Sequence, residues 1–147
     1  MAQRTERVVL NELIETCKDG ELGFANAAEH AKEPDLQGLF RKLSAERRRF
    51  AEDLQPHAQR LGGAMAHDGT NAGALHRRWM GMRSALSGHD DGAIVSETVR
   101  GDRATLSAYQ GALEELLLPE TRELIEQQYA QIQQDHEELT GHVLHHA

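Results

Sequence analysis

Apolar residues recur every three or four positions along most of the chain, which is the spacing of helices that bury one face. The first run covers about residues 5–31, with a seam of Leu10, Leu13, Cys17, Gly20, Phe24, Ala27 and Ala31. Comparable runs cover about 35–61, 90–117 and 119–145, and a shorter, one-sided run covers about 70–87. The pattern predicts an all-α protein.

The four long runs resemble two related helical hairpins. "GELGFANAAEHA" in the first run is similar to "GDRATLSAYQGA" in the 90–117 run, and the second and last runs match at apolar positions such as Leu39 with Leu124. The run at 70–87 lies between the hairpins, and its roughly 17 residues would extend about 25 Å. We therefore predict a single domain over residues 1–147, a four-helix bundle whose hairpins are joined by a helical crossover.

Four polar residues stand on or beside the apolar seams. Glu21 follows Gly20 in the first run, and the other three runs carry Glu46, Asp102 and His136. In antiparallel helices, residues equally far from the turn lie side by side, which pairs Glu21 with Glu46 and Asp102 with His136. The helical rise places both pairs near the middle of the bundle. We predict that the four side chains meet there and that Gly20 lets neighbouring helices approach.

This group has two interpretations. Three carboxylates and an imidazole form a set of hard ligands that suits iron or manganese. Arg47 also falls on the seam of the second run, and an arginine that meets the acids makes a buried ion network without a metal. A metal atom among Glu21, Glu46 and Asp102 would support the first interpretation, and contact between Arg47 and these acids would support the second.

Charge and composition narrow the class of partner. The formal net charge of −8 at pH 7 disfavours broad binding to nucleic acid or to anionic membranes, although a local cationic strip holds Arg41, Lys42, Arg48 and Arg49. The N-terminal "MAQRTERVVLNELIE" has too short an apolar run for a secretory signal or a membrane span. The lone Cys17 fits a reducing compartment, so we expect a cytoplasmic protein.

The predicted arrangement of two hairpins joined by a crossover resembles a bacterial ferritin-like family of unknown function that is distantly similar to rubrerythrin. The segments that carry the resemblance are "DGELGF", "LSAERRRFAEDLQ", "AGALHRRWMGMRSALSG" and "ETVRGDRATLSAY". The resemblance covers about residues 6–140 and implies a ferritin-like four-helix bundle. Ferritin-like di-iron proteins carry one Glu on each of two helices and a Glu-x-x-His on the other two. The resemblance therefore implies metal ligands at Glu21 and Asp102. The chain has Arg49 and Gln134 where that motif has histidine, which leaves at most a weaker or single-metal site.

Two functions follow. The first is a ferritin-like protein that binds iron or manganese at Glu21, Glu46, Asp102 and His136 and, as the resemblance implies, serves in a stress response by oxidising iron or reducing peroxide. The second is a non-enzymatic helical interaction module in which Arg47 neutralises the acids. Its cationic strip would meet an acidic partner protein or the acidic face of a second copy. The resemblance implies a homodimer in either case, and the sequence does not decide whether the protein is an enzyme.

Overall fold

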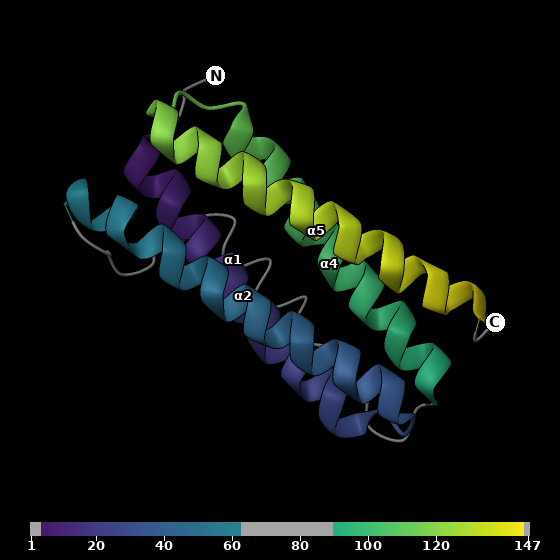
Figure 1. The fold of residues 1–147 in the computed structure, drawn as a ribbon. Coiled ribbons are helices and arrows are strands. Elements are labelled where there is room, and N and C mark those ends of the chain that lie inside the picture. Colours follow the sequence, from purple (N-terminus) through teal and green to yellow (C-terminus); the bar gives the residue numbers. More distant parts are fainter. Residues whose placement is uncertain (1–3, 63–89, 146–147) are drawn as a thin grey trace.

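The described part of the chain is entirely helical where it is regular. The computed structural model describes residues 4–62 and 90–145, and within them the helices are α1 (Glu6–His30), α2 (Pro34–Arg60), α4 (Asp91–Leu113) and α5 (Pro119–His145). Figure 1 shows the four packed lengthwise as a bundle. The prediction of an all-α four-helix bundle is confirmed. The helix predicted over about 70–87 lies outside the described residues.

Local sequence signals set the helix ends. Thr5 caps α1 by accepting a hydrogen bond from the Val8 amide at 3.2 Å, and Asp90 caps α4 by accepting one from the Ala93 amide at 2.8 Å. Pro34 opens α2, where its missing amide hydrogen costs nothing. The α4 helix ends at Leu113 rather than near residue 117, and two carbonyls at this end accept hydrogen bonds from the Arg122 side chain.

Contacts between the ends of the helices define their directions. The Asp91 carboxylate, at the start of α4, accepts hydrogen bonds from the amides of Lys32 and Glu33 in the α1–α2 turn, both at 2.9 Å. At the other end of the bundle, Arg4 donates to Glu115 at 3.0 Å, which joins the start of α1 to the end of α4. α4 is therefore antiparallel to α1 and parallel to α2, as Figure 1 shows. Parallel α2 and α4 are the arrangement of a one-crossover bundle.

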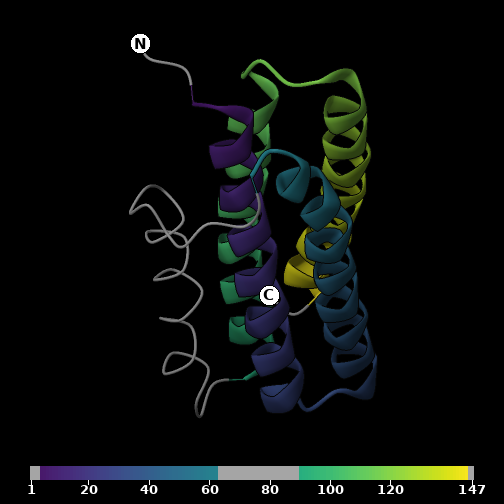
Figure 2. The ribbon, with the colours of Figure 1, turned by 90° about the vertical axis from the view of Figure 1, so that its left-hand side faces the viewer.

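The apolar core divides into two clusters, one towards each end of the bundle. One contains Phe24, Phe40 and Val95, and the other contains Leu13, Leu54 and Ile132. The boundary between them falls at the middle of all four helices. Figure 2 shows α1 beside α4 and α2 beside α5, pairs that also contact each other in the structure, so one level of the bundle is surrounded by all four helices. Arg47, Asp102 and Asp135, all buried, lie at this level.

Candidate functional site

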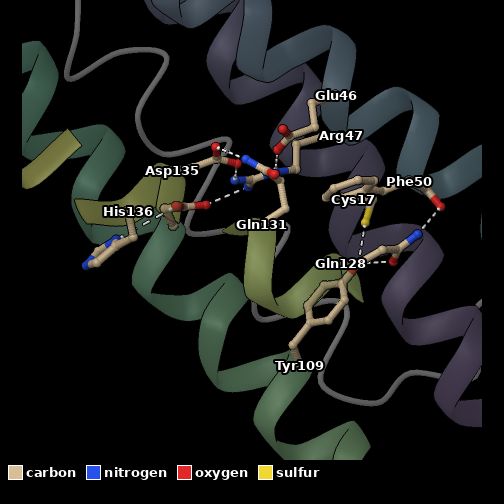
Figure 3. A network of polar contacts seen from close by, with 10 residues as sticks. Cys17, Glu46, Arg47, Phe50, Tyr109, Gln128, Gln131, Asp135 and His136 are labelled. Carbon is tan, nitrogen blue, oxygen red and sulfur yellow. Dashed lines mark hydrogen bonds and ion pairs between the residues drawn. The ribbon is translucent and has the colours of Figure 1, made fainter. Parts of the chain in front are cut away.

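Arg47 is the centre of the polar level, and it comes from the seam of α2. Its side chain is fully buried, and each of its three nitrogens faces a different carboxylate. Nη1 donates to Asp102 Oδ1 at 2.5 Å, Nη2 donates to Asp135 Oδ2 at 3.3 Å, and Nε lies 3.5 Å from Glu46 Oε1. Figure 3 shows the guanidinium between Glu46 and Asp135. The three acids come from α2, α4 and α5. We call Arg47, Glu46, Asp102 and Asp135 the Arg47 layer.

The first helix makes room for this arginine. A Cβ on Gly20 would lie 3.5 Å from Cγ of Arg47, so the side chain crosses α1 directly over the glycine backbone. The guanidinium carbon lies 5.2 Å from the ring centroid of Phe24, within the range of a cation–π contact. Gly20 therefore contacts the aliphatic part of the Arg47 side chain, and Phe24 contacts one face of its guanidinium. The arginine opposite it explains why a glycine lies on this apolar seam.

The layer combines charged and protonated groups at neutral pH. Burial works against the charged form of Arg47, but Asp102, Asp135 and Glu46 outweigh it and raise the pKa of the guanidinium. Burial also opposes ionisation of Asp102, yet Arg47 and His136 hold its pKa below the ordinary value. Burial, followed by contact with Asp135, raises the pKa of Glu46 to about 8. Arg47 and Asp102 are thus ionised at pH 7, whereas Glu46 keeps its proton.

A second buried chain of hydrogen bonds adjoins the layer, and Figure 3 shows both groups. The Tyr109 hydroxyl donates to Gln128 Oε1 at 2.7 Å, and Gln128 Nε2 donates to the Phe50 carbonyl at 3.2 Å. Because the hydroxyl has one proton, the Cys17 thiol, 3.1 Å away, donates to the hydroxyl oxygen. Burial raises the pKa of Cys17 to about 11, so the thiol is a protonated, packed group rather than a nucleophile.

The structure brings together three of the four predicted site residues. Glu46 and Asp102 belong to the Arg47 layer, and His136 lies beside it, with Nδ1 3.7 Å from Asp102 Oδ2. Glu21 is half-buried, and among the described residues no hydrogen bond or ion pair joins its carboxylate to the layer. Its backbone carbonyl accepts a hydrogen bond from Ser44 at 2.8 Å.

Sequence reasoning missed Asp135 and Gln128 because it assigned the wrong seam to α5. The apolar spacing of this helix can be followed through Tyr129 and His136, but the structure buries the residue before each of them. Both choices satisfy a spacing of three or four from Ile125 and Ile132. The apolar ring of Tyr129 favoured the wrong one. Asp135 and Gln128 each follow a buried isoleucine by three residues, and this spacing could have indicated that they face the core.

The donor set does not fit a metal in the arrangement described. Over residues 4–62 and 90–145, no group of three or more His, Cys, Asp or Glu side chains has the geometry to hold a metal ion. The carboxylates of the layer face the guanidinium instead of a common point. Among the described residues, five buried side-chain atoms nevertheless lack a hydrogen-bond partner, and they are Glu46 Oε1, Arg47 Nε, Asp102 Oδ2, Thr105 Oγ1 and His136 Nδ1.

Comparison with known proteins gives a family without an assigned activity. The family model described as "Domain of unknown function (DUF2383)" matches residues 6–115, which include α1, α2 and α4. The match ends before α5, which supplies Asp135 and His136. No curated protein matches the chain. In the described part of the chain, none of the helices has the length and apolar character needed to cross a membrane.

Proposed function

Because the chain belongs to this family of unknown function, we propose its function from the site: a non-enzymatic helical interaction module on a ferritin-like bundle, with its central acids neutralised by Arg47. The observation that carries the proposal is the fully buried guanidinium in contact with acidic side chains from three helices. A buried charge is tolerated when it is paired and hydrogen-bonded, and each nitrogen of Arg47 faces an acid.

The burial of the layer supports a structural role for these groups. Arg47 and Asp102 are both 0% exposed, so a substrate has no access to the pair without opening the bundle. The contacts instead join helices that are far apart in sequence. An ion network between α2, α4 and α5 fixes how these helices align along the bundle, which is the best-attested use of buried polar groups. A rigid body of this kind presents its exposed helix faces in a constant arrangement.

The exposed surface offers a means of binding. The cationic strip on α2, formed by Arg41, Lys42, Arg48 and Arg49, is exposed over its whole length. Within residues 4–62 and 90–145, the ion pair found on the strip joins Arg48 to Glu52 at 3.7 Å. On a chain with a net charge of −8, a concentrated positive strip favours an acidic protein surface as its partner. We infer that this strip is the binding surface of the module and that the protein acts in the cytoplasm.

Equilibrium unfolding with and without metal tests the proposal. The protein, expressed with excess iron and manganese and purified without nickel, should unfold at the same urea concentration with added chelator, Fe(II) or Mn(II). A bound metal would instead raise stability, by about 2.7 kcal/mol at a hundredfold excess over its dissociation constant. Such a gain, lost in Asp102→Asn and kept in the control Glu114→Gln on the exposed end of α4, would overturn the ion network.

Metal binding is a second candidate, favoured by the lack of a hydrogen-bond partner, among the described residues, at Glu46 Oε1, Asp102 Oδ2 and His136 Nδ1. In this proposal Fe(II) or Mn(II) is held by Glu46, Asp102 and His136, with Glu21 as a further ligand if α1 adjusts, in a stress-related role. A metal and the guanidinium would compete for the same carboxylates, so Arg47→Met should create or strengthen binding. Titration of this variant with Mn(II), followed by the bound fraction, tests the candidate. Absence of binding in both the variant and the natural sequence would end it.

A further inference from the structure

One long face of the bundle, formed by α2 and α5, is exposed in the part of the chain that the structure describes. Its residues, which we call the α2–α5 face, are Gly38, Lys42, Ala45 and Arg49 on α2 and Ala130, Gln134, Glu138 and Gly141 on α5, all of them exposed. A Cβ added at Gly38 or at Gly141 would meet nothing within 4 Å. Glycine weakens a helix relative to alanine. Packing within the described chain therefore explains neither glycine.

Contacts between the two antiparallel helices fix which residues stand at the same level. These contacts join Arg60 with Glu120, Phe50 with Gln128, and Arg47 with Asp135. Continuing this register towards the start of α2 places Lys42 level with Glu138 and Gly38 level with Gly141. Lys42 therefore stands beside a residue of opposite sign, and each exposed glycine stands beside another glycine.

We propose that the α2–α5 face binds a second copy of this chain, with α2 of each copy lying on α5 of the other. A twofold axis parallel to the helices produces this arrangement and leaves every residue at its own level along the bundle. Gly38 then meets Gly141 of the partner's helix, and Lys42 meets Glu138. Further along, the small Ala45 faces Gln134 and the long Arg49 faces the small Ala130, so large and small side chains alternate across the contact.

Charge selects this axis over the alternative. A twofold axis perpendicular to the helices would place α2 on α2 and would bring the cationic strips of the two copies together. With the parallel axis, Lys42 and Arg49, the two residues of the strip that belong to this face, meet the helix that carries the exposed acids Glu123, Glu126, Glu137 and Glu138. At the level of Lys42 and Glu138, the two copies contribute four charges that alternate in sign around the contact.

The face is large enough for a specific dimer. α2 and α5 contain 27 residues each, which makes them about 40 Å long, and two adjacent helices are about 20 Å wide. The resulting area, on the order of 800 Å² for each copy, is that of a standard protein–protein interface. This inference deepens the proposed function by naming the partner of the cationic strip. It depends on the exposed charges and glycines and not on whether the core holds a metal.

Sedimentation equilibrium on the full chain and its charge variants tests the dimer. The natural sequence should form dimers that weaken as salt is added. Lys42→Glu and Glu138→Lys should each raise the dimer dissociation constant at least about tenfold, because attraction becomes repulsion at two symmetric places. An equimolar mixture of the two variants should recover the dimer, since each then supplies the charge that the other needs. Arg103→Glu, an exposed reversal on α4, is the matched control and should leave the dissociation constant unchanged.

A bulky substitution tests the close approach independently of charge. Gly38→Arg should favour the α2 helix and leave the melting temperature of the monomer equal or higher, yet prevent dimerisation. A monomeric natural sequence at every concentration, a dimer indifferent to Lys42→Glu and Gly38→Arg, or failure of the mixed variants to pair would each overturn the proposed interface. None of these results alters the metal and chelator experiment, so failure of the dimer can be told apart from failure of the ion network.

Discussion

Replacing Arg47 with methionine is the most direct test of the buried layer. Methionine keeps much of the length of the side chain and removes the guanidinium, together with its contacts to Asp102 at 2.5 Å and Asp135 at 3.3 Å. With the pKa of Glu46 at about 8, that group is mostly protonated at pH 7, so the loss falls mainly on the two aspartates. Both are then left buried without the guanidinium.

The expected cost follows from this uncompensated charge. Removing one partner of a buried ion pair costs about 3–5 kcal/mol, which for a domain of this size lowers the melting temperature by about 10 °C or more. The second change Asp102→Asn removes one of the stranded charges and keeps the shape of the side chain. The double variant should therefore be more stable than Arg47→Met alone, which is the opposite of what two independent losses would give.

Urea unfolding followed by circular dichroism measures both effects. Arg48→Met is the matched control, because Arg48 is the next residue on α2, is exposed, and forms a surface ion pair with Glu52 at 3.7 Å. An exposed pair of this kind contributes about 0–1 kcal/mol. If Arg47→Met proves no more costly than Arg48→Met, or if adding Asp102→Asn destabilises it further, the ion network does not hold the core and the reasoning fails.

Three further substitutions test separate parts of the core. The folded protein keeps the Glu46 proton up to about pH 8, whereas the unfolded chain loses it near 4.5, so stability should fall as pH rises between these values, by up to about 1.4 kcal/mol per unit. Glu46→Gln should flatten that slope in urea melts, and an unchanged slope would refute the assignment. Tyr109→Phe leaves Gln128 without its donor and should cost about 1–3 kcal/mol in the same melts; a neutral result would contradict the hydrogen-bond chain. Gly20→Ala should be neutral or stabilising by up to about 1 kcal/mol, because its Cβ would lie 3.5 Å from Arg47, an ordinary contact; a large loss would show that the backbones are closer than described.

The helices and their order could be predicted because burial leaves a strong periodic trace in sequence. The observed bounds of α1 and α2 lie within about one residue of the prediction, because Thr5 and Pro34 mark the starts. The end of α4 was predicted too late. Apolar residues continue through Leu116 and Leu118, but both are exposed in the turn, so their periodicity reports no buried face.

The candidate site was harder to predict because a seam of one helix is ambiguous by one position. On α5 the step from Ile125 can be three or four residues, and the choice exchanges His136 for Asp135 at the centre of the bundle. The side chains on the other helices determine which residue is buried, because Arg47 donates to Asp135 while His136 lies beside the layer. The position of Glu21 could not be predicted from its neighbour either. Gly20 does lie on the buried seam of α1, but it makes room for the Arg47 side chain and does not bring Glu21 into the core.

The buried layer and the exposed face depend on the same helix register. Sliding α2 along α5 by one helical turn would shift Arg47 about 5.4 Å and remove it from Asp135, leaving charges opposite apolar side chains in the two core clusters. The cost of that shift is what selects one alignment. In that alignment Lys42 stands level with Glu138, so in the proposed dimer each Lys42 lies opposite the Glu138 of the other copy. The core arginine therefore positions the residues of the outer face without touching them, and a variant that loosens the layer should weaken dimerisation as well as stability.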